Sequence, residues 1–77
     1  MYYTYVLISK RDNNFYTGYT NNLFKRLKEH HQGKVLSTKF RIPFKLIYYE
    51  VCSCQEDAKA REKYLKSGMG SAILKID

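Results

Sequence analysis

The 77-residue sequence contains no tryptophan, only two cysteines, few acidic residues and no long apolar run. Without tryptophan, the bulk of the core must come from eight tyrosines and four phenylalanines, and a chain of this length supports one domain with a thin core. No apolar run approaches the length of a membrane-spanning helix, so we expect no membrane association. Met1 leads directly into a strand-like segment, so we expect no signal peptide and a cytoplasmic location.

The two cysteines, Cys52 and Cys54, are separated by one residue. A disulfide between them would be strained, and no further cysteine or nearby histidine completes a zinc site. We therefore expect two reduced thiols with a structural role. Repeats, low-complexity tracts and linkers are also absent, so residues 1–77 are expected to form a single domain.

Acidic residues are scarce: 7 Asp and Glu stand against 14 Lys and Arg, which gives a net charge of +7. This excess favours an anionic partner, either nucleic acid or an acidic surface. It can equally serve solubility, so charge alone does not choose between the two. The connector 33–43 and the strand that follows it carry a basic cluster, which we expect to follow a nucleic-acid backbone. The cluster consists of Lys34, Lys39, Arg41 and Lys45.

The residue pattern predicts three strands. Residues 2–9 are almost all aromatic or β-branched, as in a strand covered on both faces. Residues 10–14 form a polar turn, and 15–20 return as a second strand, so the chain is expected to open with a β-hairpin. The segment 44–51 is the predicted third strand.

Two helices and a short third one are predicted between and after these strands. Asn21 or Asn22 should cap the first, which runs to about Gln32 and stops at Gly33. Its apolar side is expected to contain Leu23, Phe24, Leu27 and His31.

The second helix should open at Ser53, with Glu56 completing a capping box, and end near residue 67. Residues 71–76 could form the third helix. The order β-β-α-β-α-α predicts an α+β domain, in which a small, mainly antiparallel three-stranded sheet is largely covered by helices.

Glu62 is unusual because it shares a helix face with Ala58 and Leu65, which should point into the core. A carboxylate on such a face is costly to desolvate and needs a cation or a hydrogen-bond partner. A structural salt bridge to Arg61 or Arg26 would satisfy it, and so would a functional role.

Arg26 and His30 are spaced i, i+4, so their side chains meet along the border of the apolar side of the first helix. An arginine can clamp phosphate oxygens and offset charge in a transition state. A nearby histidine can accept a proton or hold a water molecule. A solvated basic helix face is the alternative interpretation, because Lys25 and Lys28 are close by.

Tyr5 and Tyr16 lie on neighbouring strands of the predicted hairpin, which could place both phenols at one site. Positive charge nearby would favour the phenolate, so such a tyrosine can act as a base or a nucleophile. Core packing is the alternative for either residue, since the chain has eight tyrosines.

Together, these residues resemble the GIY-YIG nuclease domain family. Tyr3-Thr4-Tyr5 and Tyr16-Thr17-Gly18 are similar to the two triplets that give the family its name, with departures at Tyr3, Thr4 and Thr17. Three further residues follow in the order of the family motif: Arg26, His30 and Glu62. The stretches 34–39, 46–50 and 61–68 resemble the small stand-alone bacterial branch, so the resemblance covers nearly the whole chain.

This resemblance implies an endonuclease that hydrolyses DNA phosphodiesters with Mg²⁺ or another divalent metal and uses no small-molecule cofactor. Branched or damaged DNA is a candidate substrate. The larger family members often carry a downstream asparagine, and no asparagine follows Asn22 here. The resemblance also implies a role for each site residue. Tyr5 would be the general base or steer the attacking water, Tyr16 would position the phosphate, and Gly18 would let the backbone pass close to the site. Arg26 would stabilise the charge of the transition state, His30 would assist proton movement, and Glu62 would hold the metal with water and phosphate as its other ligands.

Two other functions stay open at this point. We expect no extra recognition domain of the kind that larger family members use, which is compatible with a DNA- or RNA-binding module that keeps the fold but has little or no catalysis. A protein-interaction subunit with a basic face is the third candidate. A core-facing Glu62 beside Tyr5, Tyr16 and Arg26 favours the nuclease, because binding alone does not require it. The oligomeric state does not follow from the sequence.

Overall fold

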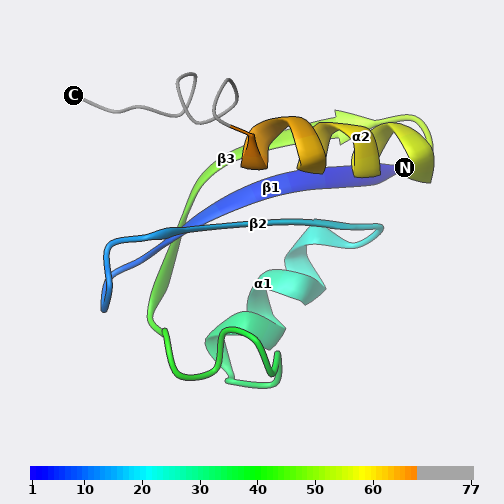
Figure 1. Cartoon of the computed structure of the whole chain (residues 1–77). Coiled ribbons are helices and arrows are strands. Elements are labelled where there is room, and N and C mark those ends of the chain that lie inside the picture. The colour runs from blue at the N-terminus through cyan, green and yellow to red at the C-terminus, as the bar shows by residue number, and fades with distance from the viewer. Residues whose placement is uncertain (68–77) are drawn as a thin grey trace.

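A computed structural model describes residues 1–67, which form a three-stranded antiparallel sheet with one helix on each face (Figure 1). This confirms the predicted α+β architecture. The predicted third helix at 71–76 lies outside the described residues. The elements are β1 (Tyr2–Ser9), β2 (Phe15–Thr20), α1 (Leu23–His31), β3 (Phe44–Cys52) and α2 (Gln55–Lys66).

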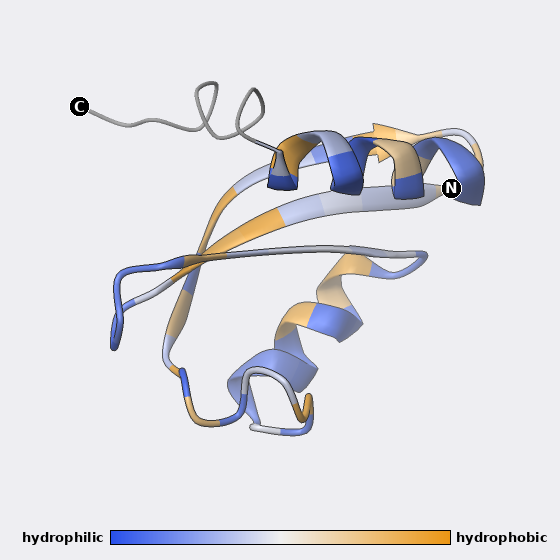
Figure 2. Cartoon of the chain, viewed as in Figure 1, coloured by the Kyte–Doolittle hydropathy of each residue, from blue (hydrophilic) through white to orange (hydrophobic). Residues whose placement is uncertain are grey.

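The strand order is β2-β1-β3, so β1 lies in the middle and β2 at an edge. Because β1 is covered on both faces, its centre is almost fully buried, as its continuous apolar pattern predicts. Tyr5 and Leu7 pack with Phe44 on the α1 side, and Val6 packs with Leu65 of α2 on the other. Figure 2 shows apolar residues gathered along β1 and β3, whereas α2 is mostly hydrophilic with a narrow apolar strip.

Helix α1 has the predicted ends. The Asn22 side chain accepts a hydrogen bond from the Lys25 backbone N–H at 3.1 Å, and Gly33 follows the helix with a φ of 73°, a conformation that favours glycine.

The predicted apolar side of α1 is partly wrong, because Phe24 is 85% exposed while His30 is fully buried. The positions that face the core, the partly buried Leu23 and Leu27 and the buried His30, follow an i, i+4, i+7 spacing. His31 is exposed, although its Nε2 lies 2.9 Å from the Phe44 carbonyl oxygen. The core-facing stripe is therefore rotated toward the polar His30, whose buried nitrogens find hydrogen-bond partners.

Helix α2 packs by Ala58 and Leu65, as predicted, but begins differently. Its N-cap is Cys54, which makes no side-chain cap bond, and the Ser53 hydroxyl donates to Asp57 at 3.3 Å. The predicted capping box with Glu56 is therefore wrong, because the chain enters the helix one residue later. Cys52 and Cys54 are both free thiols, as expected. Within residues 1–67, neither helix has the length and apolarity needed to span a membrane.

Candidate active site

A pocket of about 310 Å³ lies along β2, one of the two edge strands, and is lined by residues of both helices. Its residues come from four elements: Tyr5 from β1, Tyr16, Gly18 and Tyr19 from β2, Arg26 from α1 and Glu62 from α2. Five of these six are the residues singled out from the sequence. The fold brings them together because α1 and α2 cover opposite faces and both reach past the same edge strand.

Gly18 allows the Tyr5 hydroxyl to reach this pocket. The two residues are cross-strand partners, and a Cβ atom at position 18 would lie 2.7 Å from the Tyr5 hydroxyl oxygen. Any side chain at this position would therefore displace the hydroxyl or the strand.

His30 lies beneath the pocket rather than in it. Its Nε2 is 2.9 Å from the Tyr5 hydroxyl and its Nδ1 is 2.8 Å from Thr38 Oγ1. Thr38 Oγ1 also donates to the Val35 carbonyl oxygen at 3.4 Å, which favours the His30 tautomer that carries its proton on Nδ1. The unprotonated Nε2 then accepts the Tyr5 proton, which leaves the lone pairs of the Tyr5 oxygen for other partners.

Thr38 was missed by the sequence reasoning, which placed it in the basic connector. It is fully buried. Local sequence carries no signal for this contact, because it depends on the connector folding back against α1.

The ionisation of the Tyr5–His30 pair is governed by burial. Burial raises the pKa of Tyr5 to about 12 and outweighs the opposing effect of Arg26. Burial, with help from the Arg26 charge, lowers the pKa of His30 to about 4. Both groups are therefore neutral at neutral pH: the Arg26 charge does favour the Tyr5 phenolate, but burial outweighs it.

Arg26 enters the pocket beside the Tyr5 hydroxyl and, within the described part of the chain, keeps one buried donor unused. Its Nη1 lies 3.5 Å from Glu29 Oε1, a long contact, and its buried Nε makes no hydrogen bond within residues 1–67. The neighbouring Tyr5 hydroxyl raises the pKa of Arg26, which keeps the guanidinium charged. A buried donor without a partner is rare in folded proteins and is satisfied when an anion binds.

Glu62 is partly buried, with 23% of its side chain exposed, and its Oε2 lies 3.5 Å from Lys66 Nζ. Lys66 is more than half exposed, so this ion pair is weak. Neither structural partner suggested by the sequence pairs with Glu62, because Arg61 bonds to Glu50 at 3.0 Å and Arg26 contacts Glu29 at 3.5 Å. The carboxylate thus keeps bonding capacity toward the pocket.

The donor set at the pocket suits a hard cation. Among residues 1–67, no three His, Cys, Asp or Glu side chains form a metal cage, so Glu62 would be the single carboxylate ligand. Magnesium commonly keeps several water molecules and binds through one or two carboxylates plus substrate phosphate, whereas structural zinc requires four protein ligands. Glu62, with water and substrate phosphate as the other ligands, therefore fits Mg²⁺.

The four predicted nucleic-acid contacts have different surroundings. Lys34, Lys39 and Lys45 are exposed, and Lys39 lies over the Phe40 ring with Nζ 4.9 Å from its centroid. Arg41 instead bonds to Asp12 at 2.7 Å and donates to two carbonyls of the β1–β2 hairpin. Arg41 thus tethers the connector to the hairpin, which leaves the three lysines as the freer cations of this group.

We expect the stability of the fold to fall in mild acid because of His30. The unfolded imidazole takes up a proton near pH 6.5 and the folded one only near pH 4, so between these values the unfolded state binds more protons. The free energy of unfolding should fall by about 3 kcal/mol across this window. The Arg41 partner lowers the pKa of Asp12 to about 2, so its contribution is lost only at still lower pH.

Urea unfolding at a series of pH values measures this effect. His30→Gln should flatten the dependence between pH 6.5 and 4, while the matched His31→Gln variant should keep it. An unchanged slope in the His30 variant would assign the acid sensitivity to other groups.

Comparisons with known proteins agree with this geometry. Residues 1–72 match the family model described as the GIY-YIG catalytic domain. A UPF0213 protein of Clostridium perfringens is 45% identical over 67 residues, which cover 86% of this chain and 71% of the relative. A UPF0213 protein of Bacillus licheniformis is 48% identical over 66 residues, covering 84% and 67%.

A solved structure has the same fold. The solution NMR structure of a UPF0213 protein from Bacillus halodurans superposes with a TM-score of 0.58 at 35% identity, covering 96% of this chain and 82% of the other. The family match extends over nearly the whole chain, and the relatives carry no stated activity in their names. The chain therefore belongs to the GIY-YIG family, a nuclease-type family, and is similar to its UPF0213 members.

Proposed function

We propose that this protein is a metal-dependent endonuclease that hydrolyses DNA phosphodiester bonds. The supporting observation is that Tyr5, Tyr16, Arg26 and Glu62, from four different elements, line one pocket. Side chains that served only the core would have no need to meet at an opening. Their chemistry, with two phenols, one guanidinium and one carboxylate, matches an anionic phosphate substrate.

Arg26 and Glu62 divide the electrostatic work in this proposal. The guanidinium, with its unused buried Nε–H, binds phosphate oxygens and offsets the charge that develops on them. Glu62 would hold a divalent cation, which when bound acts as a Lewis acid on the phosphate oxygens. Tyr16, whose ring lies 5.2 Å from that of His30, orients the phosphate with its hydroxyl.

Proton transfer is best described as a relay from the attacking water through Tyr5 to His30. With a pKa of about 12, a preformed Tyr5 phenolate at pH 7 costs about 7 kcal/mol. A proton placed on His30 at pH 7 costs about 4 kcal/mol. In the relay, the Tyr5 oxygen takes a proton from water as its own proton passes to Nε2. Thr38 keeps Nε2 free to receive it.

One observation favours the second candidate, a nucleic-acid-binding module with little catalysis. His30, with a pKa of about 4, is a weaker base than an ordinary histidine at neutral pH. A bound substrate and a divalent cation would change the electrostatic environment of His30 and therefore its pKa. The two candidate functions are distinguished by whether the protein cleaves DNA when both are present.

The experiment is incubation of the purified protein with nicked, flapped, branched and single-stranded DNA, with and without magnesium. Magnesium-dependent strand cleavage is the expected result. Binding of these substrates without cleavage under any divalent metal would support the binding module instead.

We also expect DNA affinity to fall steeply with salt, because lysine and arginine release counterions from phosphate. Replacing Lys34, Lys39 and Lys45 with alanine should reduce the slope of log affinity against log salt by up to about 3, near 0.9 per lost phosphate contact. Lys59 and Lys63, exposed on α2, provide a control when replaced with alanine. An equal change per charge in both variants would mean that the connector lysines contribute only net charge.

A further inference from the structure

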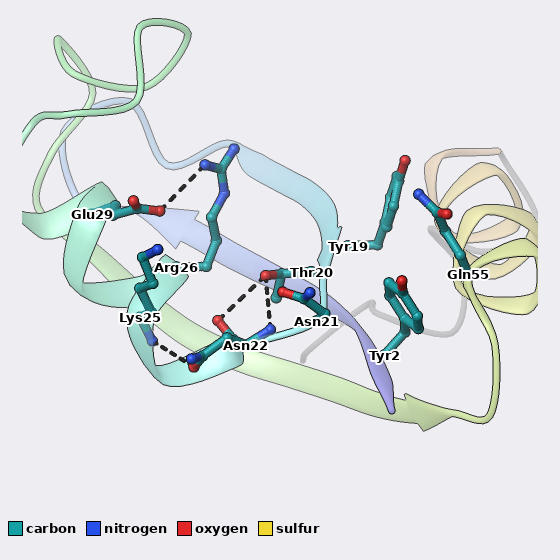
Figure 3. Close-up of a pocket in the computed structure, with 9 residues that line it drawn as sticks. All are labelled: Tyr2, Tyr19, Thr20, Asn21, Asn22, Lys25, Arg26, Glu29 and Gln55. Carbon is teal, nitrogen blue, oxygen red and sulfur yellow. Dashed lines mark hydrogen bonds and ion pairs between the residues drawn. The ribbon is translucent and has the colours of Figure 1, made fainter.

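A second hollow, of about 360 Å³, adjoins the candidate active site (Figure 3). Figure 3 shows Tyr2, Tyr19 and Gln55 on one side of it and Lys25, Arg26 and Glu29 on the other. Thr20, Asn21 and Asn22 line the part between them. The hollow thus has an aromatic side and a cationic side, which face each other.

Two residues belong to both hollows. Tyr19 and Arg26 line the pocket with Tyr5 and Glu62, and they also line this second one. The two spaces are therefore neighbours, separated by one tyrosine and one arginine. A chain-like ligand whose phosphate lies at Arg26 in the first pocket would place its next unit in the second.

Several polar groups of the hollow are uncommitted. Within residues 1–67, the Lys25 ammonium has no ion pair, and the side-chain amides of Asn21 and Gln55 make no hydrogen bond. The Glu29 carboxylate would repel a phosphate, but it lies 3.5 Å from the Arg26 guanidinium, whose positive charge offsets that repulsion. The Asn22 side chain is already occupied as the helix cap.

We propose that this second hollow binds one unpaired nucleotide next to the scissile phosphate, with its base stacked on Tyr19. The inference rests on the proposed function and names its substrate class. The ring face of Tyr19 can stack on a base, and the Lys25 ammonium can bind its phosphate. The side-chain amides in the lining can donate and accept hydrogen bonds at the base edge. The volume is at the lower end of the range for ligand pockets, about 300 to 1,000 Å³, which suits a single nucleotide.

The base must be unpaired because bases in a duplex are already stacked on both faces. A base becomes available to an aromatic side chain only in a single strand, a flap, a gap or a frayed end. The preferred substrates are therefore DNAs with an unpaired nucleotide beside the cleaved bond, rather than continuous duplex.

The test uses oligonucleotides that carry 2-aminopurine, a fluorescent base, as the first unpaired nucleotide of a flap. Binding and fluorescence are measured without metal, so that cleavage does not interfere. Tyr19→Ala should weaken flap binding about tenfold or more, because each base stack on an aromatic ring contributes on that scale, and should remove the fluorescence change. Tyr19→Phe should keep both. Continuous duplex should bind equally to all three proteins.

Tyr49→Ala is the matched control, since Tyr49 is an exposed tyrosine of β3, 52% accessible, that lines neither hollow. The inference would be overturned if Tyr19→Ala left flap binding and fluorescence unchanged, or if it weakened the binding of flap and duplex DNA equally. Either result would leave the nuclease proposal intact. A Tyr19-dependent signal in a protein that cuts no substrate would keep the nucleotide site and overturn the nuclease proposal. Absence of binding to any oligonucleotide would overturn both.

Discussion

Replacing Glu62 with glutamine is expected to abolish magnesium-dependent cleavage while leaving the fold intact. Glutamine keeps the size of the side chain but removes the negative charge that would hold the cation. The stability change should stay within about 0.5 kcal/mol, because within residues 1–67 the partly buried carboxylate has only one long ion pair, to the exposed Lys66. Cleavage assays across a magnesium titration and thermal unfolding measure the two effects.

Glu56→Gln is the matched control for this substitution, because Glu56 is an exposed carboxylate on the same helix. Flap and duplex binding without metal should be retained by both variants. If Glu62→Gln cut DNA as well as the parent at every magnesium concentration, the metal-ligand role of Glu62 would have to be abandoned.

Tyr5→Phe is expected to reduce cleavage by a factor of about 100 or more with DNA binding preserved. The substitution keeps the ring and removes the hydroxyl that passes a proton to His30. Stability should also fall by about 1–2 kcal/mol, because the buried Nε2 of His30 loses its donor. Single-turnover cleavage with saturating enzyme separates the chemical step from binding.

Variants of neighbouring residues test the relay more closely. Thr38→Val removes the acceptor of the Nδ1–H but leaves the Tyr5 hydroxyl in place, so cleavage should fall, and Thr38→Ser should restore it. Tyr16→Phe should lose less activity than Tyr5→Phe if its hydroxyl only orients the phosphate. Cleavage that survives in the Tyr5→Phe, Tyr16→Phe double variant would show that the active site lies elsewhere in the chain.

Much of the fold could be predicted because its signals are local. The run of aromatic and β-branched residues in 2–9 marks a strand covered on both faces, and Asn22 and Gly33 mark the ends of α1. Five of the six pocket residues, all but Tyr19, were also singled out in advance, through the resemblance of their order and spacing to one family. The signals for strands and helix ends depend on residues close together in the chain. The signal for the pocket residues depends on their order and spacing along the chain.

The state of the site depends on contacts that join distant parts of the chain. Tyr5 of β1 contacts His30 of α1, 25 residues later in the chain. Thr38 reaches His30 only because the connector folds back against α1. Burial then sets the pKa values of Tyr5 and His30 in a direction that residue type alone does not predict.

The same reasoning explains the error at Phe24 and the ion pair that Arg41 makes with the hairpin. Phe24 is exposed because the packed stripe of α1 is rotated toward His30, and Arg41 is held by Asp12 of the hairpin instead of being free. The sequence by itself determined which elements form and which residues are available for chemistry, because propensity, capping and periodicity act within a few residues. Only the tertiary structure decided which side chains are buried, paired or ionised, because desolvation and hydrogen bonding depend on neighbours that packing brings together.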